Sequence, residues 1–370
     1  MNVQSLSKAL YFLLLKRLVY KVEPLTARRT VIAEISYPDA DLTWCEEHKG
    51  ERYHDNKARI GNIHSVQTTE RYIILVENAY LYDPCENVNY NDSLPHYINQ
   101  MSFESEAENR IHIIDKCGEV KTINAPAFLI THVLGSFEDL ETNLIHFDAL
   151  QYEDASPYVK WSDTDVMASG EERADNFTQV TRYTVNMADW SLVDRKNLVT
   201  DPDIRQDFEF CNINPAYYGR PYKYAYMTQN VYALNGAVIK LNVDTGRIIK
   251  KELPDGLFPT EPIFVADPEG TEEDDGVILM SGVDGGKEKG FIMVYNATNM
   301  EELYYGTAPK KTLLGLHSKF YPFHVGCSQD DCTPHSSGSG LVTTPTESPD
   351  NGAGNIASTT TTIVNYVPLH

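Results

Sequence analysis

The sequence predicts an all-β protein, organised as a sandwich, a barrel or a propeller. Short runs with two-residue alternation or β-branched content recur between residues 30 and 295, each about as long as an ordinary strand. Turn signals such as Pro38–Asp39, Asp201–Pro202 and Asp284–Gly286 separate these runs. Helical periodicity is scarce. Many short strands with few helices favour an architecture built from sheets alone.

Eight segments carry the strand prediction most clearly. The turn Asn242–Gly246 followed by Arg247–Lys251 indicates a hairpin, and hairpins repeated without a tight sequence repeat fit a propeller with divergent blades. Residues Asp163–Asn176 are the best candidate for a longer loop or a helical excursion. In chain order the predicted strands are Thr30–Ile35, Tyr72–Glu77, Ile111–Ile114, Asn143–Ala149, Thr178–Asn186, Ala237–Val243, Val277–Val283 and Gly290–Tyr295.

Charge restricts the partners that we expect. The 370 residues carry a formal net charge of -22, which argues against binding to nucleic acid and to an anionic membrane surface. An uncharged, apolar substrate is compatible with this charge. No stretch is long enough to span a bilayer, because Lys16 and Arg17 end the apolar run Ala9–Leu15. That run is a strand or short helix of the fold, or alternatively a weak signal-peptide core.

Cysteine spacing and the composition of the last residues bear on compartment and domain organisation. The six cysteines form no pair of CxxC motifs, so we expect reduced thiols in an intracellular protein rather than a structural zinc site. Ser, Thr, Gly, Pro and Asn dominate Ser336–Thr362, a composition that buries too little apolar surface to fold. We therefore predict a β-domain over residues 1–325 and a disordered tail over 326–370.

Three histidines and two glutamates are candidates for a metal centre. His64, His132 and His317 are far apart in the sequence, and no HExxH-type spacing is present. A propeller brings strand ends from separate blades to one axis, where dispersed histidines could share a metal ion. Glu209 and Glu261 could accept hydrogen bonds from such imidazoles. Taken singly, each histidine fits a core or turn position and each glutamate fits an ion pair.

Five stretches resemble, in the same order, motifs of the carotenoid cleavage oxygenase family, which includes animal beta-carotene oxygenases and the retinal pigment epithelium isomerohydrolase. The resemblance runs from about Val19 to Phe323, and its third and fourth stretches are the most specific. The stretches are IHSVQTTERYIILVE (63–77), THVLGSFED (131–139), FEFCNINPAYYGRPYKYAYM (208–227), FPTEPIFVADPEGTEEDDGVIL (258–279) and GLHSKF (315–320).

The resemblance implies a seven-bladed β-propeller in which four neutral histidines hold Fe(II). It assigns His64, His132 and His317 as iron ligands, with Glu209 and Glu261 behind the imidazoles. It also places Tyr152, in DALQYED, against a polyene substrate; an ordinary sheet tyrosine is the alternative.

The chain departs from the family pattern at two points. The family's first iron ligand and first orienting glutamate precede the His64 stretch, so we expect a propeller incomplete at its N-terminus with three of the four ligands. We therefore expect weak iron binding and poor folding of this chain alone. His48 or His54 is a conceivable fourth ligand, and Gly135 stands where the family has Asn.

The implied activity is oxidative cleavage of a carotenoid or apocarotenoid double bond by O2, in the cytoplasm, with peripheral membrane contact for substrate uptake as a further option. Two alternatives stay open: a retinyl ester isomerohydrolase that needs the same iron, and a catalytically dead propeller that binds a carotenoid or a protein partner. The polyene, the bond and the oligomeric state are not specified by the sequence.

Overall fold

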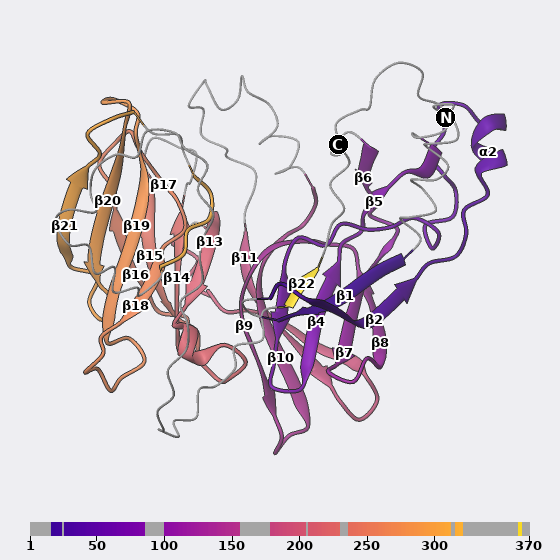
Figure 1. Cartoon of the computed structure of the whole chain (residues 1–370), viewed down its shortest axis with the longest axis horizontal. Helices are drawn as coiled ribbons and strands as arrows, with labels where there is room; N and C mark the ends of the chain where they lie inside the picture. The colour runs from indigo at the N-terminus through magenta and orange to yellow at the C-terminus, as the bar shows by residue number, and fades with distance from the viewer. Residues whose placement is uncertain are drawn as a thin grey trace.

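The structure is a computed structural model, and the regular elements of the described residues are almost all β-strands (Figure 1). The abundance of strands confirms the predicted fold class. The structure describes residues 16–23, 26–85, 100–155, 178–204, 206–229, 236–311 and 315–320, and the strand 362–364. No helix in these ranges is long and apolar enough to cross a membrane. Two helical elements have both ends within these ranges, the α-helix α2 (Leu42–Glu47) and the short 3-10 helix η2 (Pro215–Tyr217).

Four antiparallel sheets form the body of the protein. Their strands are β3 (Val66–Thr68), β4 (Tyr72–Glu77), β7 (Glu108–Asp115) and β8 (Val120–Pro126) in the first sheet; β9 (Leu129–Asp139), β10 (Leu144–Tyr152), β11 (Gln179–Asn186) and β12 (Ser191–Asn197) in the second; β13 (Phe208–Ile213), β14 (Tyr224–Gln229), β15 (Ala237–Asn242) and β16 (Ile248–Glu252) in the third; and β17 (Leu257–Pro259), β18 (Ile263–Ala266), β19 (Gly276–Asp284), β20 (Lys289–Asn296) and β21 (Glu302–Thr307) in the fourth. The second and third sheets are meanders of consecutive strands, whereas the first leaves out β5 (Tyr80–Tyr82) and β6 (Met101–Phe103), and in the fourth both β17 and β18 pair with β19.

Two smaller sheets accompany these four. β1 (Lys16–Val22) lies between β2 (Arg29–Ser36) and β22 (Thr362–Val364), and β5 pairs with β6. Apart from β22, the predicted tail 326–370 lies outside the described residues, as does the predicted excursion Asp163–Asn176.

Neighbouring sheets meet through β3, β9, β13 and β18, which are therefore the inner strands of the assembly. β3 contacts β9, β9 contacts β13, and β13 contacts β18. From β3, β9 and β13 the remaining strands of each sheet follow outward in sequence order. This is how the blades of a propeller are arranged around an axis, and Figure 1 shows the sheets side by side in that order.

Apolar side chains fill the space between successive blades, because both faces of an inner blade are covered by its neighbours. One layer joins the first and second sheets, another the second and third, and another the third and fourth. Representative members are Ile74, Ile113 and Phe147 in the first layer, Leu150, Ile213 and Met227 in the second, and Tyr226, Ile278 and Met293 in the third.

A buried ion pair joins the small β1–β2 sheet to the first blade. The Glu77 carboxylate accepts hydrogen bonds from Arg110 at 2.8 and 3.0 Å, from His112 at 3.0 Å and from the Tyr37 hydroxyl at 2.9 Å. Burial alone would raise the pKa of Glu77, but the His112 hydrogen bond and the charges of Arg110 and Arg17 lower it to about 2. Glu77 is therefore ionised and fully partnered inside the fold.

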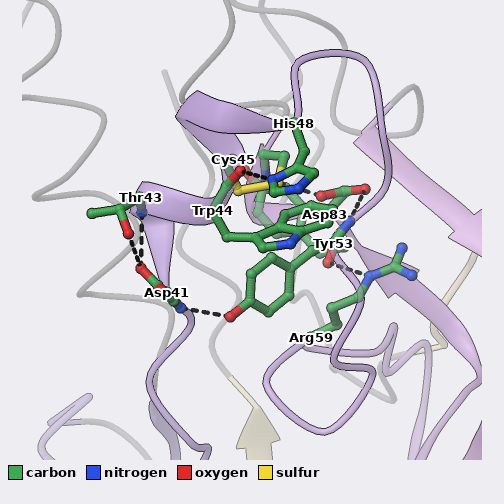
Figure 2. The surroundings of a disulfide bond; sticks show 10 residues. Asp41, Thr43, Trp44, Cys45, His48, Tyr53, Arg59 and Asp83 are labelled. Atoms are coloured by element: carbon green, nitrogen blue, oxygen red, sulfur yellow. Dashed lines mark hydrogen bonds between the residues drawn. A yellow bond between two sulfur atoms is a disulfide. The ribbon is translucent and has the colours of Figure 1, made fainter.

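A disulfide corrects the expectation of six reduced thiols. Cys45 on α2 is bonded to Cys85, with the two Cα atoms 5.0 Å apart, within the range that a disulfide can bridge (Figure 2). Helix α2 begins where the Asp41 side chain accepts from the Thr43 N–H at 3.0 Å, and this turn directs Cys45 inward. Trp44 stacks on His48 beside the bond, with ring centroids 4.3 Å apart.

Candidate metal centre

His132 is held by a buried glutamate on the neighbouring blade. The imidazole projects from β9, and its Nδ1 forms a short hydrogen bond with Glu209 Oε2 on β13. Burial raises the pKa of Glu209, but the charge and hydrogen bond of His132 and the Tyr152 hydroxyl outweigh this effect and leave the pKa below its usual value. An ionised acceptor holds a proton on Nδ1 of His132, so in the neutral form of the imidazole the lone pair is on Nε2.

His317 has the same arrangement with the second predicted glutamate. Its Nδ1 lies 3.2 Å from Glu261 Oε2, and the Ser318 N–H donates to the same oxygen at 3.3 Å. The Glu261 hydrogen bond raises the pKa of His317 against the opposing effect of burial. The His317 side chain is 54% exposed, whereas that of His132 is 13% exposed, so His317 lies at the solvent side of the pair.

The two imidazoles direct their remaining nitrogens at each other. His132 Nε2 and His317 Nε2 are 3.3 Å apart. Because both Nδ1 atoms are bound to carboxylates, two lone pairs face each other, and this arrangement is stable only with a proton or a cation between them. Metal–imidazole bonds of about 2.0–2.1 Å place adjacent nitrogen ligands about 3.0–3.4 Å apart, so the pair fits one metal ion.

His64 lies next to this pair but has a serine in place of a carboxylate. Its ring centroid is 4.8 Å from that of His132. Ser65 Oγ donates to Thr131 O at 2.8 Å, so at 3.2 Å it accepts from His64 Nδ1, which again leaves the lone pair on Nε2. Part of the His64 residue is exposed to solvent, but protein atoms crowd the imidazole. The desolvation that they cause and the His132 imidazole lower the pKa of His64 to about 4.

Local irregularities in the inner strands place these groups. The pairing of β9 with β10 shifts between Ala149 and Gln151, and that of β13 with β14 shifts after Glu209. β-bulges of this kind re-aim side chains and are common beside functional sites. Phe210 follows with φ of 51°, and its ring packs on His132 at 5.3 Å and on His317 at 5.6 Å. Sequence reasoning did not find Phe210, because a bulge has no sequence signal there.

The structure thus brings the predicted residues together, as neighbours rather than as a finished coordination sphere. Among the described residues, no set of three or more His, Cys, Asp or Glu side chains is arranged to hold a metal ion as it stands. Tyr152 is buried and its hydroxyl bonds Glu209, so contact with a substrate stays a prediction. The rings of His48 and His54 pack on Trp44 in the disulfide cluster, which does not support either as a further ligand.

Gly135 departs from the resemblance for a steric reason. A Cβ at this position would lie 2.5 Å from Tyr222 Cε1 and 3.1 Å from Ile213 Cδ1. Tyr222 fills that space and donates to Asp148 at 2.5 Å, and Asp148 also pairs with Arg182. The tyrosine ring therefore occupies the volume that a larger residue at position 135 would need.

Replacing Gly135 with alanine is expected to lower the free energy of unfolding by about 1–3 kcal/mol, the usual cost of overpacking a core. Urea unfolding followed by circular dichroism measures it. Gly286→Ala is the matched control, because the nearest atom to its new Cβ is 3.5 Å away. Equal effects of the two substitutions would contradict the steric explanation.

The antiparallel propeller fold and the two facing imidazoles, each held by a carboxylate, define a β-propeller protein with a candidate histidine metal centre. The chain belongs to the carotenoid cleavage oxygenase family, since the family model described as "Retinal pigment epithelial membrane protein" (RPE65) matches residues 19–322. The recognised resemblance is thereby confirmed.

Curated relatives are about one quarter identical to the chain. The mouse "Beta,beta-carotene 15,15'-dioxygenase" is 25% identical over 287 residues, covering 70% of this chain and 50% of that protein. "Carotenoid isomerooxygenase" of Galleria mellonella is 27% identical over 281 residues, covering 70% and 52%. "Carotenoid cleavage dioxygenase 8 homolog B, chloroplastic" of Oryza sativa subsp. japonica is 26% identical over 273 residues, covering 71% and 47%. The chain spans about half the length of these relatives.

Solved structures match the fold. The chain aligns to cobalt-substituted Synechocystis ACO with a TM-score of 0.57 and 23% identity, covering 70% of this chain and 52% of that one. An ACO/RPE65 chimera aligns with the same TM-score, identity and coverage. These likenesses confirm the propeller-type architecture.

Proposed function

We propose that the protein is an Fe(II)-dependent carotenoid dioxygenase, which cleaves a double bond of a carotenoid or apocarotenoid with O2. Family membership supports the reaction class, and relatives with dioxygenase names support the substrate class. The observation that carries the metal assignment is the pair of facing Nε2 atoms of His132 and His317, 3.3 Å apart.

Three residues would orient the proposed histidine ligands of such a centre. Glu209 and Glu261 hold the Nδ1 protons of His132 and His317, which turns the Nε2 atoms of both imidazoles toward one point. Ser65 does the same for His64. All three proposed ligands are neutral nitrogens, so a bound cation would keep its full charge. A ferrous ion there would supply the redox chemistry that activates O2.

The surroundings of His317 suit an apolar substrate. Leu316 is 52% exposed and Phe320 is 45% exposed on the same segment. Tyr218, 50% exposed, approaches Glu261 through Asn212, to which its hydroxyl donates at 3.3 Å. Exposed apolar and aromatic side chains beside a polar centre are typical of a site that binds an elongated apolar molecule.

The test is product analysis with the purified chain and Fe(II). The chain is given β-carotene or a retinyl ester in detergent micelles, under air and under argon. We expect aldehyde products under air alone, and none from the His132→Ala variant. Isomerised retinol released from a retinyl ester under argon would instead identify an isomerohydrolase. A chain that binds no iron and turns over neither substrate would identify a binding protein, and either result would overturn the proposal.

A further inference from the structure

His64 and His132 belong to different blades, so no ladder of strand hydrogen bonds fixes the distance between them. His64 precedes β3 in the first blade, and His132 lies on β9 in the second. Their ring centroids are nevertheless only 4.8 Å apart. Some contact between the two segments other than sheet pairing must therefore set this separation.

The buried side chain of Asn78 makes that contact. Its carboxamide brackets the backbone of Ile130: Nδ2 donates to Ile130 O at 2.9 Å, and Oδ1 accepts from Ile130 N–H at 2.8 Å. The backbone N–H of Asn78 donates to Asn62 O at 2.8 Å. Asn78 is 1% exposed, so water does not compete for these bonds.

The bonded residues stand in equivalent positions on the two segments. Asn62 lies two residues before His64, and Ile130 lies two residues before His132. A side-chain amide offers a donor and an acceptor side by side, and here it replaces the peptide group of a missing strand neighbour. A second link lies beyond it, where Ser65 Oγ donates to Thr131 O at 2.8 Å.

We propose that Asn78 is a positioning residue that sets the separation of His64 and His132. The inference rests on the proposed function for its consequence, since the separation matters only if both imidazoles bind one metal ion. Asn78 acts through the backbones at Asn62 and Ile130.

The chain offers a matched control in Asn109. This residue is 0% exposed, and its Oδ1 accepts from Ala79 N–H at 2.8 Å and from Phe128 N–H at 3.2 Å. It links the same two blades next to Asn78, but at Phe128, two residues farther from His132. Asn109→Ala therefore tests for a general loss of packing without releasing Ile130.

The first measurement is made on the metal-free full chain. The His64 ring proton resonance, assigned with a His64→Gln variant, senses the ring current of His132 because the two rings are edge to face. We expect this resonance to shift toward its random-coil position in Asn78→Ala and to stay in place in Asn109→Ala. Asn78→Asp keeps an acceptor for Ile130 N–H, so it should fold if Asn78→Ala does not and should give an intermediate shift.

The second measurement is a Co2+ titration followed by visible absorption. Loss of an outer positioning partner typically weakens metal affinity roughly 10–100-fold, and we expect a loss in this range for Asn78→Ala and none for Asn109→Ala. An unmoved His64 resonance, an unchanged Co2+ affinity, or equal effects of both variants would overturn the positioning role. If the wild-type chain binds no Co2+ while Asn78→Ala still moves the resonance, the positioning holds and the proposed metal function fails.

Discussion

Replacing His132 with alanine is expected to abolish the weak binding of ferrous iron that we expect of this chain. His132 is the imidazole that touches both others, with Nε2 3.3 Å from His317 Nε2 and its ring 4.8 Å from that of His64. Removal of an outer partner alone costs roughly 10–100-fold in affinity, and loss of a ligand should cost more. Anaerobic titration with Fe(II) against a chromogenic chelator measures the dissociation constant.

Two further variants make this experiment specific. His146→Ala removes an imidazole from the adjacent strand β10, where His146 packs on Phe137, and should leave iron affinity unchanged. Glu209→Gln keeps the shape of the partner but removes its charge, and should fall between wild type and His132→Ala. Wild-type affinity in His132→Ala would disprove the metal centre proposed here.

Replacing Glu77 with alanine is expected to lower the free energy of unfolding by about 3–5 kcal/mol, because it leaves Arg110 as a largely buried charge without its partner. The Glu77 side chain is 0% exposed and that of Arg110 is 17% exposed. The control is Glu34→Ala, which breaks an exposed ion pair with Lys16. The Glu34 side chain is 42% exposed and that of Lys16 is 57% exposed. Exposed pairs of this kind contribute about 0–1 kcal/mol.

Glu77 should also make the stability of the protein depend on pH. The folded pKa of Glu77 is about 2, below the ordinary value of 4.5, so its contribution is present above pH 4.5 and lost as pH falls through 2. The wild-type free energy of unfolding should therefore decline across this window, and Glu77→Gln should flatten that part of the decline. An identical slope in both proteins would contradict the assignment.

Much of the fold could be predicted because most strands keep a regular alternation. The segment Tyr72–Glu77 is a strand with the predicted bounds, and the hairpin at Asn242–Gly246 forms where the sequence places it, with Gly246 at φ of 72°. All eight predicted strands are present, and the other seven differ from the prediction at one or both ends. Strand β9 is not among the eight predicted strands, since its bulge interrupts the alternation near His132.

What the sequence could not reveal are contacts between residues far apart in the chain. His64, His132 and His317, with Glu209 and Glu261, were chosen through motifs, and the structure brings them together. The partners of Glu77 include Tyr37, 40 residues away, and Cys45 pairs with Cys85 across a separation of 40. Neither pairing has a local pattern, because each depends on how blades and loops meet after folding.

The proposed ligands come from three blades: His64 precedes the first, His132 belongs to the second, and His317 follows the last strand of the fourth. An ion bound by all three would add a further link between segments that hydrogen bonds and side-chain packing already join. Removal of the ion would weaken the contacts between these blades and let their inner strands open more often. Amide hydrogen exchange at the inner strands should then quicken together, while the outer strands keep their rates.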